Sequence, residues 1–552
     1  MAASQVCLNI HWNNHQPQYW NPRKMRYELP YVRWHAVKDY REMAVLNERY
    51  RRVKMSCDYV PSLLEQMDDY AKNSPPDRFA QIALKDPAQF TAEERSFIYQ
   101  NFVMENRKAE ESPRYVELVR KIKEGRQLSN EELSDLLASY FLIPFPASIK
   151  ESDKDIAGLY DKGRGFTHED KLLIFRKLDE YTAEVIPKLR KLSEEGIIEI
   201  ATAPYYHNLL PLTYNSDAAR IQMPWAQLPE SAFRHPEDVE EQIMRAVRYH
   251  EGIFGNPPTG LWPPEGAIST DIIPDLEKAG IKWIASCQQI LEAALGRRAK
   301  ASELSAPWKI KKNGSSVISV FRDYNLSRHI GFDYQHKSPF DAVNEMMWSL
   351  GKIRDEVAGD PGTLKGRPPL VSIILDGENA WEYYPNNGWD FLNELFSRLE
   401  KEEGWLKTMT VPEYLRLHGC PEENELGANL KPGSWVEANF STWIGSPDTN
   451  KAWGYLAKTR EALSQYVSQY GSVSWQKVEE ATRLMLAAEG SDWMWWYSGR
   501  NFSMQALVYD GLFRDYQIRI YEIIEHEIPT YLNYPLFSGQ SYGNGGRGAM
   551  QR

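Results

Sequence analysis

Short apolar runs recur along the chain, and each is followed by a polar or aromatic cluster. Seven runs stand out, at residues 6–10, 53–57, 197–200, 259–262, 283–285, 317–321 and 370–375. Continuous apolar runs of this length are typical of parallel strands that are buried on both faces. Helical patterns separate the runs, for example from Asp170 to Ser193 and from Ile272 to Ala279. This alternation predicts an α/β fold, either an open sheet or a barrel of seven or eight strands.

The lengths of the intervening stretches predict how the chain is divided. Residues 61–193 are mostly helical and charged, and they are too many for an ordinary βα loop, so we predict a helical insertion packed on a barrel. The barrel is expected over residues 1–404. Strand patterns thin out beyond it, and helical patterns predict a mainly helical C-terminal domain over residues 405–536. Residues 537–552, rich in Gly and Ser, are expected to form a flexible tail.

Composition and charge argue against several classes of protein. The 552 residues are 42% hydrophobic and 26% charged, and the net charge of −11 argues against a broad basic face for nucleic acid. The four cysteines form no CxxC pair, so neither a zinc ribbon nor a disulfide scaffold is predicted. No apolar stretch approaches the roughly 20 residues of a membrane helix. We therefore expect a soluble, cytoplasmic protein that does not bind a membrane, and the sequence leaves its oligomeric state open.

Two acidic residues stand directly after predicted strands and within aromatic surroundings. Glu265 follows Gly260-Leu-Trp-Pro-Pro264, and Asp376 follows the run at 370–375. The carboxyl ends of barrel strands converge at one mouth. Two carboxyl groups there suit glycoside hydrolysis, in which one attacks the anomeric carbon and the other protonates the leaving oxygen and later activates water. Either residue alone is more often a helix cap or a solvated charge, but the two together favour the catalytic interpretation.

Histidines near the same strand ends are candidates for binding. We interpret His15 first as a hydrogen-bonding partner for sugar hydroxyls, and His11 as a structural residue. A zinc site at these two histidines is the least favoured interpretation, because the neighbouring Asn13 and Asn14 are poor zinc ligands. His207, just beyond the third predicted strand, is expected at the mouth.

Further segments carry polar or aromatic residues with two interpretations each. We interpret Arg322 and Asp323 either as an ion pair that orients the site or as a surface pair that contributes little to stability. The densest aromatic cluster is at residues 491–497, where Asp492 and Trp493 either close a substrate cleft or belong to a helix of the core. The same two interpretations apply to the Trp-rich stretch 433–445. The sequence contains no serine nucleophile elbow, P-loop or HExxH motif, and no GxGxxG follows the first strand.

Taken in order, five segments resemble the signatures of glycoside hydrolase family 57, and within it the amylopullulanase/α-amylase type. They are His15-Gln-Pro17, Ile198 to His207, Gly260 to Ser269, Leu375 to Tyr383 and Ala488 to Tyr497. Two positions depart from the resemblance. Asn13 stands where similar proteins often have His, and Ser498-Gly-Arg-Asn501 stands where they often have Gly-Asp-Asp-His.

The resemblance implies a (β/α)7 barrel with a C-terminal helical domain that completes the substrate cleft. It implies a retaining double displacement on α-glucans, at α-1,4 linkages and, as a further option, α-1,6 linkages. Glu265 would be the nucleophile and Asp376 the general acid/base, with no cofactor and no metal. The residues that would position the glucan are His15, His207, Trp262, Asp323, Trp381, Asp492 and Trp493.

Three alternatives remain open at this point. A 4-α-glucanotransferase or branching enzyme shares the covalent intermediate and differs only in its acceptor. A metal-dependent deacetylase or α-mannosidase would use His11 and His15. A carbohydrate-binding protein without catalytic activity is kept open by the changed residues after Tyr497.

Overall fold

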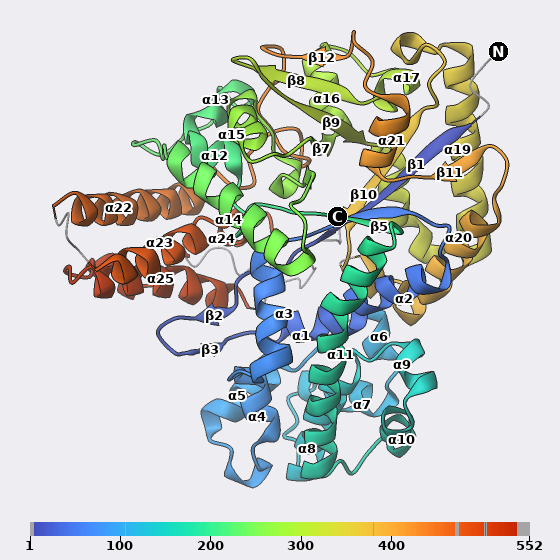
Figure 1. Ribbon diagram of the computed structural model, residues 1–552. Coiled ribbons are helices and arrows are strands. Elements are labelled where there is room, and N and C mark those ends of the chain that lie inside the picture. The colour runs from blue at the N-terminus through green and yellow to red at the C-terminus, as the bar shows by residue number, and fades with distance from the viewer. Residues whose placement is uncertain are drawn as a thin grey trace.

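A ring of parallel strands forms the centre of the molecule (Figure 1). The computed structural model describes residues 5–104, 106–378, 380–469, 474–501, 503 and 505–537. The strands of the ring are β1 (Val6–Asn14), β4 (Met55–Tyr59), β5 (Ile198–Ala201), β6 (Gly260–Leu261), β7 (Trp283–Cys287), β9 (Ser315–Arg322) and β10 (Leu370–Asp376). Each coincides with one of the apolar runs in the sequence, so the predicted strands are confirmed.

The ring runs in the order β1-β4-β5-β6-β7-β9-β10 and returns to β1. At two places, neighbouring strands of the ring are joined by a single pair of residues. β5 meets β6 through the bridge between Thr202 and Leu261, and β9 meets β10 through the pair Ser372 and Arg322. The seven-stranded barrel is therefore nearly closed, and the predicted (β/α)7 fold is confirmed.

Side chains of β1 alternate between the barrel interior and the surrounding helices. Leu8, Ile10 and Trp12 pack outward in the large core that the helices share, whereas Cys7 packs inside the barrel. This two-residue period is expected of a strand that is buried on both faces. Every second side chain of β1 from Cys7 to Asn13 therefore faces the barrel interior. Because β1 ends at Asn14, Asn13 lies at the carboxyl end of the barrel.

Helices cover the barrel between successive strands. The main ones are α2 (Arg41–Arg49), α14 (Pro236–Phe254), α15 (Ile273–Lys278), α16 (Gln288–Leu295), α18 (Tyr324–Arg328), α19 (Pro339–Gly359) and α20 (Trp389–Lys401). In the described residues, no helix combines the length and the apolar character that crossing a membrane requires.

The connection from β4 to β5 forms a helical lobe, which confirms the predicted insertion. Its helices are α3 (Pro61–Asn73), α4 (Arg78–Leu84), α5 (Ala92–Asn101), α6 (Arg107–Glu110), α7 (Pro113–Lys123), α8 (Asn130–Leu142), α9 (Ala147–Ser152), α10 (Lys154–Lys162) and α11 (His168–Glu194). α11 packs against α3 and β5, and α4, α5 and α8 lie toward the end of the lobe away from the barrel (Figure 1). α6 instead contacts the turn Pro385–Gly388, which follows β10. Thr91, Ser129 and Thr167 begin α5, α8 and α11 with capping boxes.

The part of the chain beyond α20 first returns to the barrel and then forms helices. β11 (Leu406–Thr408) pairs with β1, and β12 (Glu425–Leu426) pairs with β8 (Trp308–Lys312). The helices are α21 (Val411–His418), α22 (Pro447–Gln469), α23 (Trp475–Ala488), α24 (Ser491–Tyr497) and α25 (Ala506–Ile523). α22, α23 and α25 pack side by side (Figure 1), which confirms the predicted C-terminal helices. Of the predicted tail, residues 538–552 lie outside the described residues.

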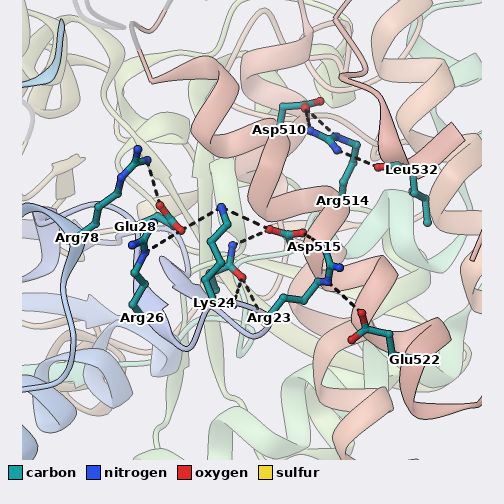
Figure 2. Close-up of polar contacts among 11 residues, drawn as sticks. Arg23, Lys24, Arg26, Glu28, Arg78, Asp510, Arg514, Asp515, Glu522 and Leu532 are labelled. Carbon is teal, nitrogen blue, oxygen red and sulfur yellow. Dashed lines mark hydrogen bonds and ion pairs between the residues drawn. The ribbon is translucent and has the colours of Figure 1, made fainter. Parts of the chain in front are cut away.

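A polar network joins these C-terminal helices to the N-terminal part of the chain (Figure 2). The hairpin of β2 (Trp20–Asn21) and β3 (Arg26–Tyr27) lies against α25. Arg23 forms ion pairs with Asp515 at 2.8 Å and with Glu522 at 3.1 Å, and the Asn21 amide donates to Asp515 at 2.7 Å. Because α24 packs on α25, this network also holds α24 close to the barrel.

Candidate active site

The backbone at Glu265 adopts an unusual conformation. Glu265 lies in a 3₁₀ turn, Pro264–Gly266, directly after β6, and its φ of 58° is in the left-handed region that non-glycine residues seldom adopt. The turn is held on both sides, because the Ser286 hydroxyl donates to the Gly266 carbonyl at 2.6 Å and the Trp435 N–H donates to the Glu265 carbonyl at 2.7 Å. Strain that is fixed in this way is typical of functional sites.

The carboxyl group of Glu265 receives a hydrogen bond from the Trp435 indole N–H, at 2.9 Å from Oε2. Burial and then the charge of Asp376 raise its pKa to about 8; the Trp435 bond acts in the opposite direction and the charge of Asp492 adds to the rise. The coupling means that the carboxyl groups of Glu265 and Asp376 lie within electrostatic reach of each other. Below a pH of about 8, Glu265 therefore holds its proton in the ligand-free protein.

Asp376 is the last residue of β10 and stands opposite Asn13 in register. The Asn13 amide donates to Asp376 Oδ1 at 2.9 Å, so the residue that departs from the family resemblance contacts the predicted acid/base. The next residue, Gly377, donates its N–H to the Asn13 carbonyl at 2.7 Å. A Cβ at Gly377 would lie 2.0 Å from Asn14 Oδ1, so only glycine fits the close approach of these two strand ends.

Three predicted binding residues from distant parts of the sequence come together. His15 Nε2 lies 2.8 Å from Asp492 Oδ1, and the His15 and His207 rings are stacked with centroids 3.6 Å apart and an angle of 9°. His207 Nδ1 lies 3.0 Å from the Ser491 hydroxyl. Burial and then the neighbouring His15 keep the pKa of His207 well below its ordinary value, so His207 is neutral at physiological pH.

The donor atoms of His15, His207 and Asp492 lie within 4.8 Å of one another, which raises the question of a metal. The two rings are nearly parallel, so an ion in the plane of one imidazole lies outside the plane of the other by about the stacking distance. Zn²⁺ needs lone pairs that converge on it, and this arrangement does not fit a metal.

His11 takes no part in this group. Its ring bonds to Asp58 at 2.8 Å with both side chains fully buried inside the barrel, and burial lowers the pKa of His11 to about 3. The histidine pair that a metal-dependent deacetylase or mannosidase would use is therefore not assembled, since His15 bonds instead to Asp492.

Trp262 and Trp381, two further predicted binding residues, are buried more deeply than His15. Trp262 is fully buried and packs edge-on against Trp435, with centroids 5.1 Å apart. Trp381 is 1% exposed and donates its indole N–H to the Gly377 carbonyl at 2.8 Å, so it supports the turn after Asp376.

Trp493 and Asp323 make local contacts. Trp493 is 1% exposed, and its indole N–H bonds to the Ala487 carbonyl at 3.0 Å, so it anchors the start of α24. Asp323 caps α18 by accepting the Leu326 N–H at 2.9 Å. These contacts support secondary structure beside the mouth.

Sequence reasoning did not single out two residues that contact the site. Trp435 was one of several aromatics in an ambiguous stretch, and its bond to Glu265 spans 170 positions. Glu378 is 3% exposed and accepts hydrogen bonds from the His15 N–H at 3.2 Å and the Gln16 amide at 3.1 Å. The signal was present in both cases, because Glu378 lies inside the fourth signature-like segment and 433–445 is rich in Trp.

A family comparison accounts for this arrangement. The model of glycosyl hydrolase family 57 matches residues 9–426, a range that includes both Glu265 and Asp376. The chain belongs to glycosyl hydrolase family 57. The part that contributes Asp492 lies beyond the matched range.

Relatives within family 57 are distant. The 1,4-alpha-glucan branching enzyme of Thermococcus kodakarensis is 27% identical over 438 residues, which are 67% of this chain and 60% of the relative. The chain thus spans about 60% of the length of that curated relative. The named relatives include branching enzymes and an α-amylase, so the amylopullulanase/α-amylase type predicted from the motifs is not singled out within the family.

Solved structures of family 57 share the fold. The crystal structure of the T. kodakarensis branching enzyme, in complex with glucose and additives, has a TM-score of 0.58 and 16% identity and covers 94% of this chain and 90% of its own. The branching enzyme of Pyrococcus horikoshii has a TM-score of 0.57 and 16% identity, covering 98% of both chains. The α-amylase AmyC of Thermotoga maritima has a TM-score of 0.57 and 14% identity, covering 94% and 93%.

Proposed function

We propose that this family 57 protein is a retaining enzyme that hydrolyses α-glucans, with Glu265 as the nucleophile and Asp376 as the general acid/base. The observation that carries the proposal is the electrostatic coupling of these two carboxyl groups at the carboxyl ends of β6 and β10. Paired carboxyl groups are the chemistry that retaining glycosidases use.

In the first step, the ionised Glu265 attacks the anomeric carbon while the bond to the glycosidic oxygen breaks. Asp376 gives its proton to the departing oxygen, and a β-linked glycosyl ester forms on Glu265. In the second step, Asp376 takes a proton from water, which attacks the same carbon and releases Glu265. Two inversions leave the product with the α configuration.

This mechanism needs one proton for the leaving oxygen. In the ligand-free protein, burial favours that proton on Glu265. The positive charge that develops on the sugar ring in the transition state favours ionised Glu265 instead. In this proposal the proton of Glu265 is released when substrate binds, and Asp376 delivers the proton that the leaving oxygen needs.

The group of His15, His207 and Asp492 is proposed to bind the sugar next to the scissile bond. Buried His15 Nδ1 and His207 Nε2 have no hydrogen-bond partner among the described residues, so a sugar hydroxyl would satisfy them. Bonds of this kind position the anomeric carbon, and positioning is a large part of the catalytic effect.

Transfer of the glycosyl group to another sugar is the second candidate, and the similarity to a branching enzyme favours it. The covalent intermediate is the same, but a sugar hydroxyl replaces water in the second step.

Incubation with pullulan, amylose and maltohexaose, followed by chromatography and a reducing-end assay, distinguishes the two candidates. Hydrolysis increases the number of reducing ends, whereas transfer keeps it constant. Glu265→Gln and Asp376→Asn should each lower turnover by orders of magnitude. Glu382→Gln, which changes a nearby carboxylate that is 32% exposed, is the matched control. Near-full activity in Glu265→Gln or Asp376→Asn would refute the assignment of that residue.

A further inference from the structure

The stretch 433–445 lies directly against the turn that carries Glu265. Gly433 and Ile268 form an antiparallel bridge, with hydrogen bonds of 3.0 and 3.2 Å between their backbones. A Cβ at Gly433 would lie 2.3 Å from the Ala438 carbonyl oxygen, so the backbone is closely packed here. The bridge therefore fixes the start of this stretch against the turn that carries Glu265.

Trp435 holds Glu265 at two points. Its backbone N–H donates to the Glu265 carbonyl at 2.7 Å, and its indole N–H donates to Oε2 at 2.9 Å. The indole is itself clamped, edge-on to Trp262 with centroids 5.1 Å apart and beneath the Arg322 guanidinium, whose Cζ lies 5.1 Å from the ring centroid. A donor that is fixed in this way sets the direction of the carboxylate.

Charged groups from three elements face this carboxylate or its partner. Asp376 at the end of β10 and Asp492 on α24 both disfavour the negative charge of ionised Glu265. Arg322 at the end of β9 interacts electrostatically with Asp376 and stacks on Trp435. The indole N–H is the neutral donor among them, and a hydrogen bond to an ionised acceptor is stronger than one to the acid form.

We propose that Trp435 is a positioning residue for the nucleophile, which holds Glu265 Oε2 toward the anomeric carbon and favours the ionised form of Glu265. This inference rests on the proposed function of Glu265. If the proposal is right, removing the indole N–H of Trp435 while keeping the shape of the ring changes both the turnover rate and its pH dependence.

The test replaces Trp435 by Phe and measures kcat and KM on maltohexaose from pH 5 to 10. Without the donor, Glu265 holds its proton more tightly, so the fall in activity on the alkaline side should move to higher pH. kcat should drop roughly 10- to 100-fold, as expected for a lost hydrogen bond to a charged group, with a smaller change in KM. Trp443→Phe is the matched control, because Trp443 is a buried indole in the same stretch whose N–H has no partner among the described residues.

A second variant covers the case in which Trp435→Phe fails to fold. Incorporation of β-(3-benzothienyl)alanine at position 435 replaces the N–H by sulfur and keeps both rings. A wild-type pH profile in either folded variant overturns the proposal while leaving the function intact, provided that Glu265→Gln is inactive in the same assay. If Glu265→Gln is as active as the wild type, the proposed function itself fails and the role of Trp435 falls with it.

Discussion

Replacement of Asp376 by Asn tests directly how the charge of Asp376 acts on Glu265. In the wild type, burial and the charge of Asp376 raise the pKa of Glu265 to about 8, so at pH 7 about one tenth of Glu265 is ionised in the free protein. The variant keeps the shape of the side chain and removes its charge, so the pKa of Glu265 falls. A fall of one unit raises the ionised fraction at pH 7 to about one half.

The sign of the pH dependence differs between the two proteins. The reaction needs one proton, which Glu265 holds in the free wild-type protein, so kcat/KM should fall above a pH of about 8, where Glu265 loses it. In Asp376→Asn the active form needs only ionised Glu265. Its activity should rise with pH through the lowered pKa of Glu265 and then stay level, with no fall on the alkaline side.

The assay compares two substrates. An α-glucosyl fluoride has a leaving group that needs no proton, whereas maltohexaose has a glycosidic oxygen that does. Loss of a general acid costs roughly 10²- to 10⁴-fold, so kcat/KM of Asp376→Asn, which reports the first step alone, should fall by that much on maltohexaose and far less on the fluoride. The second step needs Asp376 as a base with either substrate, so kcat is not the quantity compared. Equal losses on both substrates, or a persistent alkaline fall with the fluoride, would refute the reasoning.

Other positions give further expectations. Gly377→Ala should abolish most activity and lower the melting temperature, because its Cβ would lie 2.0 Å from Asn14 Oδ1; unchanged activity and melting would contradict the close approach. Glu199, inside the barrel, has a pKa that burial raises to about 7, from an ordinary value near 4.5, so the native state binds the extra proton between these values. Its contribution to stability is therefore present below pH 4.5 and is lost as the pH rises through about 7. Glu199→Gln should flatten this slope in thermal unfolding, and an unchanged slope would show that another group is responsible. Asn13→Ala should lower kcat roughly 10-fold by removing the 2.9 Å bond to Asp376, and a wild-type rate would exclude a role for that bond.

The barrel strands could be predicted because burial on both faces leaves a simple signal in the sequence. Each of the seven apolar runs became a strand of the ring. The short strands β8, β11 and β12 could not be found in this way. β11 pairs with β1, β8 with β9 and β12 with β8, and β12 spans only Glu425–Leu426, so tertiary contact and not local pattern defines them.

The placement of the two candidate catalytic residues was predictable, because each lies at or just after the end of a strand of the barrel. Glu265 and Asp376 follow β6 and β10, and the convergence of strand ends in a barrel brings them toward one mouth. The role of each aromatic residue was not predictable. Trp381 is enclosed in the core, whereas Trp435 reaches Glu265 from a stretch 170 positions away, and no local pattern encodes such a contact.

The identity of the residue that becomes covalently bound to sugar tests the central claim most directly. The protein is incubated with a 5-fluoro-α-glucosyl fluoride, which slows release of the glycosyl ester, and is then digested and mapped by mass spectrometry. We predict one added glycosyl group, on the carboxyl of Glu265. A label on Asp376 or Asp492, or no label in a preparation that turns over α-glucan, would contradict the account.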